Sequence, residues 1–148
     1  MQLTHLSDAR AYLVRTFQGR DWPKRHWSAG KTFAHCAQTI ECAMDGYPSL
    51  KPAWVRATLG RLVIGKFLRQ GQMRHGLSAP VPGAPEIPES TGTAEGLDRL
   101  LAAIDRFQAH TGPLQPHLLF GQMSRDDYDR YFAMHIADHL REFDLPAG

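Results

Sequence analysis

The sequence predicts an all-α protein, and three observations support this class. Apolar residues recur at the three- and four-residue spacing of amphipathic helices in four or five segments. No segment shows the alternation of apolar and polar residues that is typical of a half-buried strand. The stretches between the helical segments are rich in proline and glycine, which favour irregular loops. A chain of 148 residues suits one domain with a substantial core, so we expect residues 1–148 to form a single helix bundle.

The first two helices are marked by their ends. Apolar periodicity predicts a helix over residues 4–17, and Gly19 follows as a stop signal. Ser28 is a suitable N-cap for a second helix over residues 29–45, because its hydroxyl can accept a bond from a free N–H of the first turn. Gly46 stands at the position where a helix commonly ends.

A third helix is expected over residues 52–68, although Gly60 and Gly65 weaken its continuity. Residues 71–92 contain four prolines, with Gly76 and Gly83 among them, so we expect an irregular loop there. A loop of this length within a small domain is usually functional or disordered, and a simple surface excursion remains the alternative.

Two further helices complete the chain. Thr93 is the expected cap of a helix over residues 94–109, and residues 111–123 form a second irregular segment. Ser124, with Asp127 three residues later, resembles a capping box in which Asp replaces the usual Glu or Gln. The acidic residues at this point also favour the positive end of a helix dipole, which explains them without invoking catalysis.

Composition excludes several classes of protein. Apolar residues make up 43% of the chain and charged residues 22%, which is ordinary for a soluble globular protein, and the net charge is only +2. The basic residues form no long run, so we expect no nucleic-acid partner. No stretch of 18 apolar residues and no signal pattern is present, so we expect no membrane partner and a cytoplasmic location. Cys36 and Cys42 point about 120° apart on one helix, and we expect buried free thiols rather than a disulfide.

The most informative feature is a pair of histidines in the last helix. His135 and His139 are four residues apart, so both rings lie on one helical face and can reach one object. Neutral imidazole is a common metal ligand, but two ligands are too few for a tight site. The pair is not a His-Glu-x-x-His zinc protease motif, because Ile136 stands where that motif has Glu.

A helical wheel places both rings on or beside the apolar stripe. The following residues form that stripe: Tyr128, Phe132, Ile136, Leu140 and Phe143. Arg130, Asp138 and Arg141 lie away from it. Two histidines that face a core must be hydrogen-bonded or metal-bound, because burying an unpaired polar group costs about 2–7 kcal/mol. The residues alone leave both alternatives open.

His35 is the candidate third ligand, although its own wheel is less favourable. The strong apolar stripe of its helix does not include it, and the face that it shares with Gln38 and Thr39 carries little charge. Periodicity therefore leaves open whether His35 faces the same interior as the pair. His117, in the irregular segment before the last helix, is a candidate for lining a cavity or moving a proton. We interpret the following histidines as surface or loop residues: His5, His26, His75 and His110.

Other chemical motifs are absent from the sequence. The chain contains no Gly-x-Ser-x-Gly elbow and no Cys-x-x-Cys pair, which excludes a serine hydrolase of the usual elbow type and a zinc finger. A catalytic role for either cysteine would need a nearby base, which no spacing in the sequence requires.

Five blocks of the chain together resemble the DinB-like superfamily, in particular a branch of short bacterial proteins. The blocks are residues 27–38, 46–48, 82–85, 116–124 and 131–140. The last of them, with the His-x-x-x-His pair, is the most specific, and the resemblance spans nearly the whole chain.

The resemblance implies an all-α four-helix bundle with a long crossover connection. Members of the superfamily typically carry one histidine on the second helix and the His-x-x-x-His pair on the last, and these converge on a divalent metal. Carried over position by position, the implied metal ligands are His35, His135 and His139.

The resemblance also implies a function. Some relatives are transferases that act with low-molecular-weight thiols, and others are metal-dependent hydrolases or isomerases. We therefore expect a divalent-metal enzyme with an open position for a small-molecule substrate, of the thiol-dependent transferase class, with Zn²⁺ or Ni²⁺ suiting three nitrogen ligands. Metal-dependent hydrolysis and a non-enzymatic metal- or ligand-binding bundle are the alternatives. Bundles of this kind often pair, so a homodimer is a further expectation.

Overall fold

The computed structural model describes residues 2–20, 22–23, 26–143 and 145. Its regular structure is helical throughout this part of the chain, apart from one isolated bridge between His117 and Gly121. The elements are α1 (Leu6–Phe17), α2 (Ala29–Asp45), α3 (Ala53–Val55), the π-helical segment η1 (Arg56–Gly60), α4 (Arg61–Gln70), α5 (Thr93–Ala109) and α6 (Arg125–Leu140). The predicted all-α class is confirmed.

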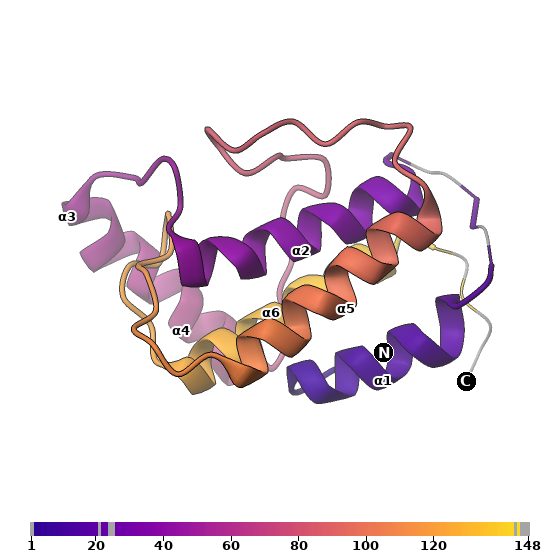
Figure 1. The fold of residues 1–148 in the computed structure, drawn as a ribbon. Helices are drawn as coiled ribbons and strands as arrows, with labels where there is room; N and C mark the ends of the chain where they lie inside the picture. Colours follow the sequence, from indigo (N-terminus) through magenta and orange to yellow (C-terminus); the bar gives the residue numbers. More distant parts are fainter. Residues whose placement is uncertain (1, 21, 24–25, 144, 146–148) are drawn as a thin grey trace.

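Helix α6 has a central place in the arrangement. It contacts α1, α2 and α4, while α2 runs alongside α5 (Figure 1). The loop that joins α4 to α5 passes α2 and runs along the side of α2 that faces away from α5. The loop before α6 lies beside η1. No helix in the described residues is long and apolar enough to cross a membrane.

Helix α2 begins and ends where its caps predict. The Ser28 hydroxyl accepts a hydrogen bond from the Lys31 N–H at 3.2 Å, and Gly46 ends the helix with a φ of 109°. Side chains on both of its faces are buried. Phe33 and Ile40 pack into the main core, whereas Gln38 on the opposite face donates a hydrogen bond to the Pro85 carbonyl of the 71–92 loop. The face with little charge is therefore an interior face, and the 71–92 loop covers part of it.

The predicted helix over residues 52–68 is divided into α3, η1 and α4. It extends to Gln70, and the π-helical turn occupies its middle and ends at Gly60. Part of its apolar pattern does not face the core, since Trp54, Leu59 and Leu62 are between 58% and 73% exposed. The periodicity of this segment thus reflects exposed apolar side chains as well as a buried side.

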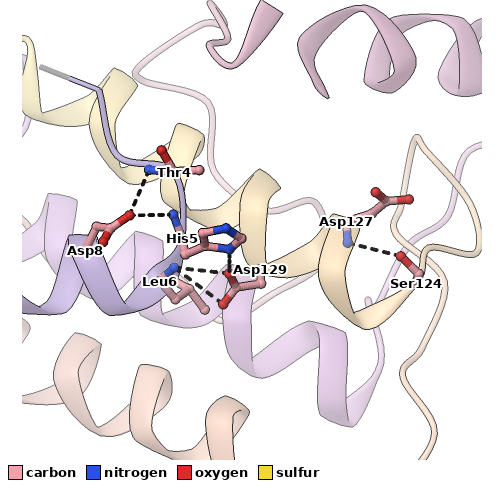
Figure 2. A network of polar contacts seen from close by, with 7 residues as sticks. All are labelled: Thr4, His5, Leu6, Asp8, Ser124, Asp127 and Asp129. Carbon is pink, nitrogen blue, oxygen red and sulfur yellow. Dashed lines mark hydrogen bonds and ion pairs between the residues drawn. The ribbon is translucent and has the colours of Figure 1, made fainter. Parts of the chain in front are cut away.

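The starts of α5 and α6 differ in how they are capped. Thr93 is the first residue of α5 rather than its cap; Gly92 takes the N-cap position and no side chain bonds there, so that expectation was wrong. At α6 the Ser124 hydroxyl accepts a hydrogen bond from the Asp127 N–H at 3.1 Å, which is the N-cap bond of the predicted capping box (Figure 2).

Helix α6 also anchors the start of α1. Figure 2 shows the Asp129 carboxylate beneath the first turn of α1, where it accepts hydrogen bonds from the Leu6 N–H and contacts His5 Nδ1 at 2.7 Å. Asp8 closes the same turn by accepting from the N–H groups of Thr4 and His5. The acidic start of α6 therefore serves two helix ends, its own and that of α1.

Candidate metal centre

The three histidines expected to meet do lie together. His35 reaches inward from α2, and His135 and His139 reach inward from successive turns of α6. One nitrogen of each ring can be chosen so that all three lie within 4.8 Å of one another. The ring centroids are 5.4 Å apart for His35 and His135, 5.0 Å for His35 and His139, and 4.7 Å for the pair on α6. Each side chain is at most 4% exposed.

Burial keeps these rings neutral at physiological pH. It is the main cause that lowers the pKa of His35 to about 4, with smaller contributions from His75 and Lys31. Burial likewise holds the pKa values of His135 and His139 well below the ordinary 6.5, and the neighbouring imidazoles lower them further. A neutral imidazole keeps a lone pair on one nitrogen, which is the form that binds metal.

Two further observations describe the immediate surroundings of the rings. Nδ1 of His135 is buried and has no hydrogen-bond partner among the described residues, although leaving a buried polar group unpaired is costly. Trp27 packs against the cluster, with its ring centroid 5.1 Å from that of His35 and 6.3 Å from that of His139. A buried cluster of neutral imidazoles with an unpaired nitrogen fits a metal-binding group.

A fourth histidine, which the sequence did not place here, lies against the same cluster. His75 stands in the loop after α4, and its ring centroid is 4.8 Å from those of both His135 and His139. Its Nε2 is 3.2 Å from Nε2 of His139. The interpretation of His75 as a surface or loop residue was right about the loop and wrong about the surroundings of the ring.

Asp138 holds His75 in this position. Its Oδ2 accepts hydrogen bonds from the backbone N–H of His75 at 3.0 Å and from the ring Nδ1–H at 2.6 Å. Its Oδ1 accepts from the Arg141 guanidinium. The wheel placed Asp138 away from the apolar stripe, yet its side chain is fully buried, because residues 71–75 pack over that face of α6. The position of Asp138 directly before the candidate ligand His139 was the one signal in the sequence that could have indicated its role.

The cluster opens into a pocket of about 420 Å³. His35, His75 and His135 line one side of the pocket. Most of the remaining wall is apolar and includes Val63, Phe67, Val81, Leu118 and Phe120. The 71–92 loop and the segment before α6 both contribute to the wall. A second pocket, of about 360 Å³, shares His35 and residues 80–82 and is lined by Trp27 and Lys31.

His117 lies in the wall of the larger pocket, with both ring nitrogens engaged. Its Nδ1 accepts hydrogen bonds from the N–H groups of Leu119 and Phe120, each at 3.1 Å. Nε2 therefore carries the proton and donates to the Tyr131 hydroxyl at 3.2 Å. Burial lowers the pKa of His117 to about 3. This arrangement lets the ring orient Tyr131, which also lines the pocket.

The remaining candidates lie outside the cluster. Cys36 and Cys42 are buried free thiols, as expected, and burial raises the pKa of both, to about 11 for Cys42. Such thiols are inert, because the thiolate is the reactive form. His26 faces Glu142 at 3.4 Å and His110 contacts the Pro113 carbonyl at 3.3 Å.

The fold and the cluster together define a class, namely helical proteins with buried histidines that could hold a metal ion. A family model described as a protein of unknown function, DUF1569, matches residues 1–145. The chain belongs to the DUF1569 family. Searches of curated proteins and of solved structures gave no significant match.

Proposed function

We propose that this DUF1569 protein binds one divalent metal ion through His35, His135 and His139, and uses it as an enzyme on a small molecule. The observation that carries the proposal is the convergence of three buried, neutral imidazoles from two helices, with ligand atoms within 4.8 Å of one another. Three protein nitrogens are a usual set for a catalytic zinc ion, which keeps a further position for water or substrate.

The donor set supports Zn²⁺ or Ni²⁺ as the ion. Imidazole nitrogen suits both, whereas Mg²⁺ and Ca²⁺ prefer oxygen ligands, and the three rings provide none. When bound, such an ion lowers the pKa of a coordinated water or thiol, or polarises an electrophile.

The residues around the ion would select the substrate. The apolar walls of the 420 Å³ pocket would bind an apolar body and exclude water from it. The Tyr131 hydroxyl, which accepts a hydrogen bond from His117, has its own proton free to donate to a substrate heteroatom. His117 would thus contribute by holding Tyr131, rather than by exchanging protons itself.

Thiol-dependent transfer is the reaction class that we favour, and it rests on the resemblance to the DinB-like superfamily. Metal-dependent hydrolysis is the second candidate, because an open metal position beside a pocket serves both reactions. A metal-binding bundle without turnover is the third. Assays of several thiols with electrophilic substrates, and of ester and amide hydrolysis, separate these three candidate functions. No activity in any of them favours the metal-binding bundle. The cytoplasmic location and the homodimer stay predictions.

Metal analysis of protein purified without a histidine tag tests the proposal. We expect about one ion per chain, and none in His135→Ala, which removes one of the three ligands. His110→Ala is the matched control, since His110 lies outside the cluster, and it should keep full occupancy. Less than about 0.2 ion per chain in the unaltered protein, with no loss of stability on adding a chelator, would contradict the proposal.

A further inference from the structure

We propose that His75 is a fourth ligand of the same metal ion, and that Asp138 is the residue that positions it. This inference rests on the proposed function, because it needs a metal at the cluster. It adds a ligand that the 71–92 loop supplies, whereas the other three stand on helices.

The hydrogen bond to Asp138 fixes the tautomer of His75. The Asp138 carboxylate can only accept a hydrogen bond, so the 2.6 Å contact requires the proton of His75 on Nδ1. In the neutral ring the lone pair is then on Nε2. Carboxylates that bond the far nitrogen of a ligand histidine fix its tautomer in this way in many metal sites, and they raise its basicity.

The lone pair on Nε2 of His75 lies beside His139. Nε2 of His75 is 3.2 Å from Nε2 of His139. Two nitrogens bound at about 2.0–2.1 Å to one tetrahedral ion lie about 3.4 Å apart, so the observed separation fits a shared ion. The ring centroids agree on the α6 side, because His75 is 4.8 Å from both histidines of α6, close to the 4.7 Å between those two. The group of nitrogens that lie within 4.8 Å of one another comprises His35, His135 and His139 only, so His75 has to move closer to His35 to share the ion.

Asp138 holds both the backbone and the ring of His75. The backbone N–H and the ring of His75 both bond Oδ2 of Asp138, whose other oxygen bonds Arg141. Two bonds to one buried carboxylate fix the residue independently of the rest of the loop. Asp138 is adjacent in sequence to His139, so the same turn of α6 supplies one ligand and positions another.

A fourth imidazole changes the coordination expected of the resting protein. With His75 bound, the site would offer four nitrogen ligands, and a substrate would have to expand the coordination or displace one of them. The chemistry of the incoming group is that of a donor able to compete with imidazole, such as a thiolate or a deprotonated oxygen.

X-ray absorption and metal titration of the full-length protein loaded with Zn²⁺ test this inference. We expect four imidazoles around zinc in the unaltered protein and three in His75→Ala, with a loss of zinc affinity greater than tenfold. Asp138→Asn keeps the volume but weakens the hold on His75, and carboxylate partners of this kind are worth about 10–100-fold in affinity. His26→Ala, which alters a histidine on the surface, should change neither measurement.

The outcomes are distinguishable. Three imidazoles in the unaltered protein, with zinc affinity unchanged in His75→Ala and Asp138→Asn, would overturn the inference and leave the three-histidine metal site standing. The Asp138–His75–His139 contacts would then be a plain hydrogen-bonded chain. No bound zinc at all would overturn both proposals. If His75→Ala does not fold, the imidazole count of the unaltered protein and the zinc affinity of Asp138→Asn still decide whether His75 is a ligand.

Discussion

The ring of His117 is held neutral inside the pocket wall, and this makes the stability of the folded protein depend on pH. Burial lowers its pKa to about 3, below the ordinary 6.5, so the unfolded chain binds a proton at a higher pH than the folded protein does. The stability that the neutral ring contributes is complete above about pH 6.5 and is lost as the pH falls from there toward 3.

Replacing this ring should flatten the pH profile of stability. In His117→Asn the titrating group is gone, while the amide oxygen can still accept from Leu119 or Phe120. We expect the free energy of unfolding, measured by urea denaturation of metal-free protein, to depend less steeply on pH. The slope between about pH 6 and pH 4 should fall by about 1.4 kcal/mol per pH unit. His26→Asn, at an exposed position, is the control. Identical slopes in the unaltered protein and both variants would contradict a lowered pKa of His117 in the folded protein.

Single residues of the centre differed in how far the sequence could predict them. The four-residue spacing was sufficient to place His135 and His139 on one face of their helix. His35 was ambiguous because α2 is buried on both faces, so neither face of its wheel could be excluded. His75 and Asp138 were missed because one lies in an irregular loop and the other is buried by that loop, and neither position follows from helical periodicity.

At the scale of elements, η1 and the segment before α6 approach each other closely at Gly60. A Cβ added to Gly60 would lie 1.9 Å from the Leu119 carbonyl oxygen, a contact that only a backbone shift relieves. Gly65, five residues further along the same helical stretch, has only the end of the Arg69 side chain nearby, at 3.4 Å. The two glycines therefore have different roles.

Alanine substitutions should separate these roles. We expect Gly60→Ala to lower the free energy of unfolding by about 1–3 kcal/mol, as overpacking does, and to disturb the pocket wall formed by Leu119. Gly65→Ala should instead raise it by up to about 1 kcal/mol, because alanine favours the helix. Chemical denaturation of both variants measures the difference. Equal effects of the two substitutions would show that the approach at Gly60 is not tight.

The elements were predictable where their ends are marked locally. Ser28 and Gly46 delimit α2 by hydrogen bonding and backbone conformation that depend on a few neighbouring residues. The division of residues 52–68 was not predictable, since the π-helical turn lies where a distant backbone, that of Leu119, meets Gly60. Local sequence contains no information on that contact.

At the scale of the whole molecule, the centre links parts of the chain that are far apart in sequence. The ligands of the proposed site come from α2 and α6, and His75 adds the loop after α4. An ion that binds only the folded protein stabilises all of these together.

Metal binding should therefore raise global stability. With free Zn²⁺ at a hundred times its dissociation constant, we expect the free energy of unfolding to rise by about 2.7 kcal/mol relative to protein in chelator. Urea denaturation in the two conditions measures this. His135→Ala should show no difference between them, and an unaltered protein that also shows none would argue against a metal held by the fold.

The all-helical class was the part of the fold that the sequence predicted best, because periodicity and the absence of alternating segments are properties of the whole chain. The exposed apolar side chains of Trp54, Leu59 and Leu62 were the exception, since a helical pattern alone does not say which apolar residues find a partner.

Trp27 gives the proposed centre an optical signal of its own. Its indole lies within 5.1 Å of His35 and 6.3 Å of His139, measured between ring centroids, whereas Trp54 is 73% exposed on α3. A paramagnetic ion such as Co²⁺ or Ni²⁺ at the histidines would quench the fluorescence of Trp27 by proximity. Loading of the centre could therefore be followed by emission in the unlabelled protein, with Trp54→Phe removing the most exposed source of background.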